Sequence, residues 1–196
     1  MANDTKKIVT LGIMSALGAI LMIIEIPYPL VPFLMIDLSD VVVLVIFAFY
    51  GWKEAATVGL LKAIIHALTK GAVGPMFIGQ ITAFIASMSY VLGMYISANK
   101  LNLNRLLSAV VSVLVVTIIL TVANYLFITP IWFGETTYLD IKDWVTPATF
   151  ELDVKGGYLL TILIVYVPFN LLKGTIITSV FYMVYRSISF LKPETK

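Results

Sequence analysis

The sequence predicts an all-α polytopic membrane protein, a bundle of six transmembrane helices with extracellular lid loops. Of its 196 residues, 60% are hydrophobic and only 12% are charged, and the mean hydropathy is +1.01. Soluble domains are about half apolar and a quarter charged, so this composition indicates an integral membrane protein. The length fits one membrane-embedded domain over 1–196 and leaves no room for an additional soluble catalytic domain.

Composition and motifs exclude several classes of function. The chain has no cysteine and one histidine, His66, which excludes thiolate chemistry and a multi-histidine metal site. Its net charge of +2 without a basic stripe argues against nucleic-acid binding. No nucleotide-binding loop, zinc-protease motif or serine–histidine elbow is present. We therefore expect no enzyme, no metal and no cofactor, and any energy for transport must come from a partner.

The first predicted helix is an apolar run that follows Lys6 and Lys7. No small-residue cleavage site comes after it, and it is long enough to span a membrane, so we expect a retained helix rather than a signal peptide. Apolar stretches between polar turns predict the other helices. In chain order the six predicted helices cover about 8–26, 39–50, 54–70, 76–98, 105–130 and 158–190.

Small residues are spaced regularly along the first predicted helix. They form two pairs four residues apart, Gly12 with Ala16 and Ser15 with Ala19. Such pairs let helices approach closely in lipid, where association depends on van der Waals fit. They fit packing inside this protein and docking to another membrane subunit equally well.

An apolar segment with three prolines, Pro27, Pro29 and Pro32, follows the first helix. Fixed proline φ angles predict extended, irregular backbone. At membrane depth such backbone must be buried in protein or line a cavity. Asp37 can cap the next helix, and Asp40 falls in its first turn, where the helix dipole favours a carboxylate.

Two predicted helices carry lysines among apolar neighbours. In the last one, Asn170 and Lys173 lie three residues apart on one face, just after Pro168. A lysine in hydrocarbon is costly, so a cavity or a partner should face it; a kinked helix whose lysine reaches the headgroups is the alternative. Lys62 lies on one face with His66; it either pairs with an acid such as Asp37 or Asp40 or contacts a ligand, whereas His66 is interpreted as a packing residue.

Six helices place both termini on one side of the membrane, and that side is richer in lysine and arginine. The positive-inside rule therefore predicts cytoplasmic termini, with the proline segment, the turn at 71–75 and the acidic segment 134–157 outside. Loops as long as the last are often lids. The polar residues predicted to converge on one outward-facing pocket are Gln80, Asn124, Asn170 and Lys173.

The predicted pocket suits a planar small molecule with a polar edge. Amide side chains present a donor and an acceptor side by side, which matches a heterocycle edge with N–H and C=O groups. An inorganic cation would need more carboxylates than the predicted helices offer. The predicted stacking residues are Phe33, Met35, Phe84, Tyr125, Phe127 and Trp132.

These motifs, found together and in order, resemble a known family over most of the chain. They are Pro27-x-Pro29 with Phe33-Leu-Met-Ile-Asp-Leu-Ser-Asp-Val41, then Gly79-Gln80, Asn124-Tyr-Leu-Phe-Ile-Thr-Pro130 and Pro168-Phe-Asn-Leu-Leu-Lys-Gly174. The sequence resembles the riboflavin-binding S components of energy-coupling-factor (ECF) transporters, the RibU type.

The resemblance implies a multi-pass protein of the bacterial plasma membrane that captures riboflavin outside the cell. It also implies partners, namely a membrane coupling protein and two cytoplasmic ATPases. The helix-5 and helix-6 contacts to the isoalloxazine edge carry over to Asn124, Asn170 and Lys173. The remaining predicted contacts are, for the ligand, Leu34, Met35, Ile36, Asp37, Gln80 and Lys62, and, for the coupling protein, Gly12, Ser15, Ala16 and Ala19.

The chain departs from the family pattern at three positions. Met35 and Ala63 stand where the family often has lysine and asparagine, and Ala83 stands where it often has asparagine. These departures affect the expected ribityl contacts more than the ring contacts. Three other hypotheses stay open: an S component for a different vitamin, a small intramembrane enzyme using Lys62, His66 and an aspartate, and a subunit that only packs.

Overall fold

The computed structural model describes residues 2–133 and 157–189. The described chain is mostly helical, with one short two-stranded antiparallel sheet. Its elements, in chain order, are α1 (Ala2–Ile23), β1 (Ile26–Tyr28), β2 (Val31–Ile36), α2 (Ser39–Tyr50), α3 (Trp52–Lys70), η1 (Pro75–Phe77), α4 (Ile78–Met94), η2 (Tyr95–Lys100), α5 (Arg105–Ala123), η3 (Asn124–Ile128), α6 (Thr129–Phe133) and α8 (Gly157–Ile188). Of these, η1 is a 3-10 helix, and η2 and η3 are π-helical.

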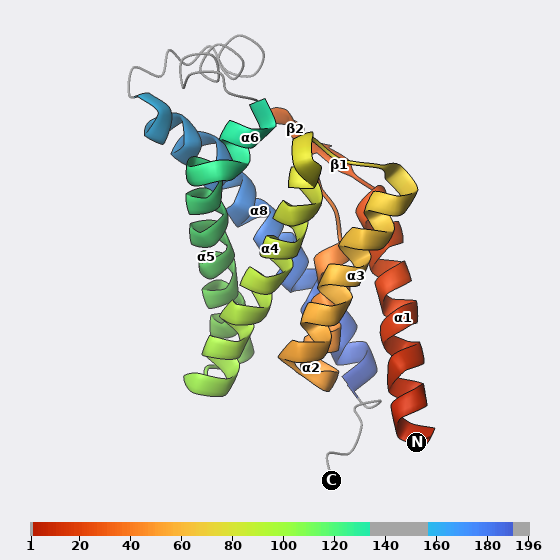
Figure 1. The fold of residues 1–196 in the computed structure, drawn as a ribbon. Helices are drawn as coiled ribbons and strands as arrows, with labels where there is room; N and C mark the ends of the chain where they lie inside the picture. Colours follow the sequence, from red (N-terminus) through yellow and green to blue (C-terminus); the bar gives the residue numbers. More distant parts are fainter. Residues whose placement is uncertain (1, 134–156, 190–196) are drawn as a thin grey trace.

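The long helices form an elongated bundle with two distinct ends (Figure 1). One end, the hairpin end, carries the β1–β2 hairpin, η1 and α6; at the other, the helix-terminal end, α1 begins and α8 finishes. Within the bundle α1 packs on α3, α4 on α5, and α5 on α8. Helix α2 contacts α1, α3, α4 and α8, so it lies at the centre of the packing.

Helix α2 is short and buried. Every residue from 39 to 46 is buried, and the four valines and Leu44 form part of the main apolar core. At about 1.5 Å per residue its 12 residues span roughly 18 Å, which is shorter than the roughly 30 Å hydrocarbon layer. Gly51, with φ of 101°, then turns the chain directly into α3.

Four helical segments are long and apolar enough to cross a membrane by length and composition: Asp4–Ile23, Pro75–Lys100, Arg105–Trp132 and Tyr158–Ile188. The chain is therefore a membrane protein with several candidate spans. The two other expected stretches are also helical, as α2 and α3. Helix α2 is too short for that criterion, and α3 carries four charged residues, Lys53, Glu54, Lys62 and Lys70. Membrane crossing by α2 and α3 stays a prediction.

The proline segment differs from its prediction. Its backbone is extended, as expected, but it is regular: β1 and β2 pair antiparallel, with Ile26 opposite Ile36 and Pro27 opposite Met35. Proline is tolerated here because each strand of a two-stranded sheet has a free edge. Tyr28 and Val31 are buried against α8, so the hairpin closes one end of the bundle.

Three predicted helix ends also differ. Helix α1 finishes at Ile23 rather than near residue 26, because Ile26 enters the sheet. The fourth helix begins with η1, where Met76 and Phe77 have left-handed φ angles of 52° and 58°. The fifth turns π-helical at Asn124 instead of continuing as an α-helix. By contrast, α8 continues through Pro168 as one 32-residue helix.

Candidate ligand-binding site

A cavity lies near the hairpin end, between β2, α6 and the long helices. Its described lining comes from α1, β2, α3, α4, α5, η3, α6 and α8, together with connecting segments. It encloses about 1020 Å³ of empty space, open mouth included. The walls are largely apolar and aromatic, with a few polar side chains among them, which is the usual composition of a ligand pocket.

One polar face of the cavity comes from α8. Asn170 and Lys173 both line it, as the three-residue spacing predicted. Asn170 is 3% exposed, and its Nδ2 has no hydrogen-bond partner among the described residues. An unpaired buried amide is unfavourable by about 1–3 kcal/mol. Asn170 therefore offers an unused donor in the cavity wall.

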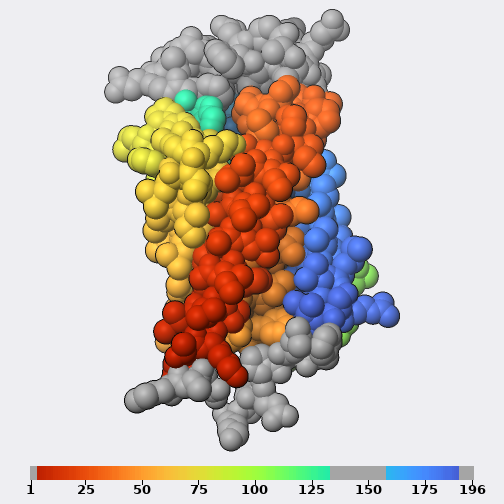
Figure 2. Space-filling model, turned by 90° about the vertical axis from the view of Figure 1, so that its right-hand side faces the viewer, coloured from red at the N-terminus to blue at the C-terminus, as the bar shows by residue number. Residues whose placement is uncertain are grey.

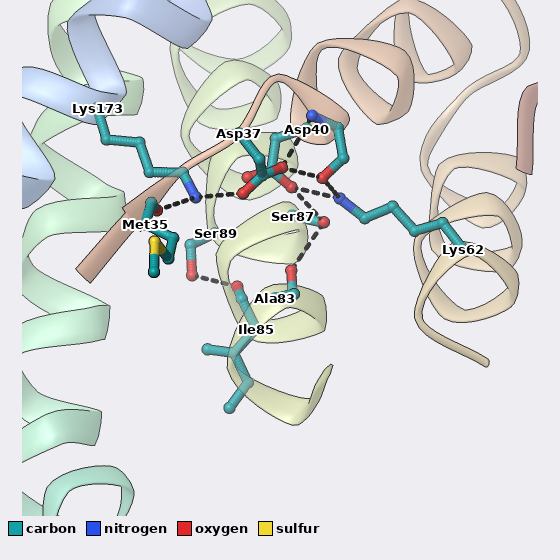
Figure 3. Close-up of polar contacts among 10 residues, drawn as sticks. Met35, Asp37, Asp40, Lys62, Ala83, Ile85, Ser87, Ser89 and Lys173 are labelled. Atoms are coloured by element: carbon teal, nitrogen blue, oxygen red, sulfur yellow. Dashed lines mark hydrogen bonds and ion pairs between the residues drawn. The ribbon is translucent and has the colours of Figure 1, made fainter. Parts of the chain in front are cut away.

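Lys173 is held by the segment that leads into α2. Its Nζ lies 2.7 Å from Asp37 Oδ2 and 3.5 Å from the Met35 carbonyl (Figure 3). Asp37 Oδ1 also accepts the backbone N–H of Ser39, the first residue of α2, at 2.9 Å. The N-cap of α2 is Leu38, and no described side chain makes a cap hydrogen bond there, so the prediction that Asp37 caps this helix is corrected: it bonds the first N–H from one residue before the cap. Both Asp37 and Lys173 line the cavity.

Asn124 lines the cavity from the π-helical turn η3. Its Nδ2 donates to the Leu120 carbonyl at 2.7 Å, and its Oδ1 accepts from Thr129 Oγ1 at 3.2 Å. Thr129 Oγ1 in turn lies 2.9 Å from the Tyr166 hydroxyl. These bonds fix the amide but leave one N–H and one lone pair free. Short π-helical turns such as η3 are frequent at functional sites.

A second ion pair lies behind the first. Lys62 Nζ is 2.7 Å from both Asp40 Oδ1 and Ser39 Oγ, and Ser87 Oγ donates to Asp40 Oδ1 at 2.6 Å (Figure 3). Ser39 Oγ donates to Asp37, which links this pair to Lys173. Lys62 is fully buried and does not line the cavity. The pairing prediction for Lys62 is thus confirmed, and its alternative prediction as a ligand contact is not supported.

Gln80 is also placed behind the cavity wall. Its amide bonds the Val73 N–H, the Gly71 carbonyl and the ring of His66. His66, which the sequence suggested as a packing residue, does line the cavity. The sequence predicted Gln80 at the ligand and His66 in packing. The structure shows the reverse: His66 lines the cavity, and Gln80 lies behind it and bonds its ring.

Most of the predicted ligand residues come together. Ile36 does not, because it packs with the cluster of Tyr28, Val31 and α8. Lys62 and Gln80 also stay off the wall. The predicted residues that line the cavity are Leu34, Met35, Asp37, Asn124, Asn170 and Lys173.

The aromatic lining was predicted only in part. Phe33 and Trp132 line the cavity, whereas Phe84, Tyr125 and Phe127 are not among its described lining residues. Sequence reasoning missed Tyr166 and Phe169, which lie four residues before Asn170 and Lys173 on α8. That i,i+4 spacing was the signal that could have found them.

The small residues of α1 divide into two groups. Ser15 and Ala19 are 0% and 2% exposed and are buried in the bundle. Gly12 and Ala16 are exposed on the outer face, where α1 runs along the surface (Figure 2). Ser15 and Ala19 therefore cannot present a docking surface without unpacking α1, and that part of the prediction is corrected.

The buried group explains how closely α1 and α3 approach. A Cβ added to Gly18 would lie 3.2 Å from Lys62 Cβ. The stem of Lys62 therefore packs directly against the α1 backbone, and the small side chains beside Gly18 leave room for α3.

Comparison with known proteins decides the family. Residues 6–185 match the family model described as "ECF transporter, substrate-specific component". The chain belongs to this family. The S component is thus a transport protein rather than an enzyme.

Similar proteins are known from several bacteria. The S component is 29% identical to "Riboflavin transporter FmnP" of Bacillus subtilis (strain 168), over 92% of this chain and 90% of that protein. It is 29% identical to "Riboflavin transporter RibU" of Staphylococcus aureus (strain TCH60), over 97% and 94%. A solved chain described under "Structure and mechanism of the S component of a bacterial ECF transporter" superposes with a TM-score of 0.72 at 26% identity, covering 97% of this chain and 99% of that one.

Proposed function

We propose that this S component captures riboflavin outside the cell and releases it inward when joined to an ECF module. The observation that carries the proposal is the unpartnered Asn170 Nδ2 in the cavity wall, beside Lys173. The similar proteins from Bacillus and Staphylococcus bear the name riboflavin transporter, which supports the same ligand.

The cavity chemistry fits an isoalloxazine ring. The free N–H groups of Asn124 and Asn170 and the Lys173 ammonium supply donors for the carbonyl oxygens of the pyrimidine edge. The remaining Asn124 lone pair can accept the ring N–H. Phe33, Trp132 and other aromatic wall residues offer flat apolar faces for the rest of the ring.

The proposal includes a topology and a partner surface. The positive-inside rule favours cytoplasmic termini, so the hairpin end with its cavity faces outward. The whole chain then acts as one membrane-embedded binding domain. The exposed α1 face around Gly12 and Ala16 is the candidate contact for the membrane coupling protein, and two cytoplasmic ATPases supply the energy. Of the expected lid over 134–157, residues 134–156 lie outside the described residues, and Gly157 begins α8.

A flavin titration in mild detergent tests the ligand. We expect the purified protein to quench riboflavin fluorescence saturably, with roughly ten- to hundredfold weaker binding in Asn170→Ala. Thr121→Val is the matched control, because Thr121 is buried with an unpartnered hydroxyl but does not line the cavity. Absence of saturable riboflavin binding by folded wild-type protein would overturn the proposal.

A further inference from the structure

His66 is fully buried in α3 and forms part of the cavity wall. Its Nδ1 lies 3.3 Å from Gln80 Nε2, and its Nε2 has no hydrogen-bond partner among the described residues. Unpartnered buried side-chain atoms are few in the described chain, namely His66 Nε2, Asn170 Nδ2 and Thr121 Oγ1. Two of them belong to residues that line one cavity, so these two point to a bound molecule.

The neighbouring backbone fixes which way the Gln80 amide faces. Gln80 Oε1 accepts from the Val73 N–H at 3.1 Å, and Gln80 Nε2 donates to the Gly71 carbonyl at 2.8 Å. In the opposite orientation the Gln80 N–H₂ group would face the Val73 N–H, and the Gln80 oxygen would face the Gly71 carbonyl. Neither pair can form a hydrogen bond. The Gln80 atom beside His66 is therefore an N–H₂ group, which can only donate.

This orientation determines the state of the imidazole ring. A donor at Gln80 Nε2 requires an unprotonated Nδ1 on His66. The neutral ring then carries its proton on Nε2, since one ring nitrogen donates while the other accepts. His66 therefore holds an N–H donor in the cavity wall, and a ligand acceptor is the group that would satisfy it.

The position of His66 indicates which part of the ligand it meets. The donors that suit the pyrimidine edge come from η3 and α8, whereas His66 comes from α3, on the other side of α4 from α5 (Figure 1). A flavin has polar groups in two places, the pyrimidine edge and the ribityl chain, and its benzenoid end bears only methyl groups. A donor that reaches the cavity from a different helix than the ring-edge donors thus suits a ribityl hydroxyl oxygen.

We propose that His66 is a ligand-contacting residue whose Nε2–H donates to a ribityl hydroxyl of the bound flavin. Gln80 is its positioning residue, because it holds the ring in the tautomer that can donate. This inference rests on the proposed function, since it assumes that the cavity binds a flavin. It also supplies a ribityl contact in a chain whose Met35, Ala63 and Ala83 depart from the family pattern on the ribityl side.

A pair of ligands separates this contact from general packing. Riboflavin has the ribityl chain, and lumiflavin has a methyl group in its place. His66→Phe keeps a flat ring and removes both nitrogens, so the ratio of riboflavin affinity to lumiflavin affinity should fall roughly tenfold or more. Thr121→Val should leave that ratio unchanged. Equal losses for both ligands, or no loss for riboflavin, would overturn the role of His66.

Nitrogen NMR gives a second, direct reading. His66 is the only histidine of the chain, so ¹⁵N-histidine labelling of protein purified without a histidine tag yields a single imidazole. We expect a protonated Nε2 and a bare Nδ1, with the Nε2 proton resonance shifting downfield on saturation with riboflavin. Gln80→Leu should let both tautomers appear. A proton on Nδ1 in the wild type, or an Nε2 resonance that riboflavin does not move, contradicts the inference.

These outcomes distinguish the two proposals. If the folded wild type binds neither flavin, the proposed function fails. If it binds riboflavin but the His66→Phe ratio and the Nε2 resonance do not change, only the role of His66 fails.

Discussion

Lys173 Nζ lies 2.7 Å from Asp37 Oδ2, which joins the middle of α8 to the segment that leads into α2. Both side chains line the cavity. A ligand that bonds Lys173 therefore also meets the carboxylate that holds it. Binding of a ligand at α8 is thus connected to the start of α2 through one ion pair.

Breaking that ion pair should affect stability and binding differently. Lys173→Met leaves Asp37 without its cation, so both melting temperature and riboflavin affinity should fall. Because the side chains are 14% and 12% exposed, we expect the stability loss at or below the lower end of the roughly 3–5 kcal/mol found for fully buried pairs. Adding Asp37→Asn should restore much of the melting temperature but not the affinity. Restored affinity in the double variant would exclude Lys173 as a ligand contact.

Lys62 should behave as a structural lysine. Lys62→Met leaves the buried Asp40 carboxylate without its cation, so we expect a loss of roughly 3–5 kcal/mol in the free energy of unfolding. Lys62→Met combined with Asp40→Asn removes both charges and should recover most of it. Thermal unfolding followed by fluorescence measures both effects. If the folded double variant binds riboflavin more than tenfold (about 1.4 kcal/mol) weaker than the wild type, Lys62 does contact the ligand.

The two asparagines should differ in their secondary effects. Asn124→Ala and Asn170→Ala should each weaken riboflavin binding by roughly ten- to hundredfold. Asn124 also bonds Leu120 and Thr129, so its removal should lower the melting temperature. Asn170 Nδ2 has no such partner among the described residues, and its variant should melt near the wild type without ligand. Titration and melting of ligand-free protein check both, and a wild-type affinity in Asn170→Ala removes it from the site.

The two groups of small residues on α1 should separate docking from folding. Ala16→Trp adds bulk to the exposed face, so flavin binding should persist while assembly with the ECF module and cellular uptake fall. Ser15→Trp forces a large ring into a buried position and should impair folding and binding together. Uptake assays paired with titration of purified protein make the comparison. Normal uptake by Ala16→Trp would remove this face from the partner contact.

Membrane orientation can be tested with single cysteines, because the natural chain has none. Val145→Cys should react in intact cells with a membrane-impermeant reagent, whereas Ser187→Cys, exposed at the helix-terminal end, should react only after permeabilisation. The reverse pattern would place the cavity on the cytoplasmic side and contradict capture from outside.

Periodicity and composition were sufficient for much of the fold. They predicted helices at α2, α3 and α8 to within a few residues, since long apolar stretches and Gly51 leave few alternatives. The spacing of Asn170 and Lys173 likewise predicted a shared polar face. The β1–β2 hairpin was missed because three prolines argue locally against a ladder, and only the free edges of a two-stranded sheet make them acceptable.

The division of roles among similar residues could not be predicted. Lys62 and Lys173 are both lysines in apolar helices, and which of them faces a cavity depends on how α1, α3 and α8 pack. The same holds for Gln80 and His66. They lie on different helices, and one contact between their side chains places His66 at the cavity and Gln80 behind it. Tertiary packing, rather than local chemistry, decides which member of each pair meets a ligand.

The shortness of α2 has a consequence for how the protein is made. Helix α2 is too short to cross the hydrocarbon layer upright, and α3 would bring an uncompensated Lys62 into it. Only Gly51 separates the two helices, and folding back at that residue sets Lys62 against Asp40. We therefore expect the translocon to release 39–70 as one closed hairpin, with its charges neutralised during biosynthesis and before α4 and α8 arrive.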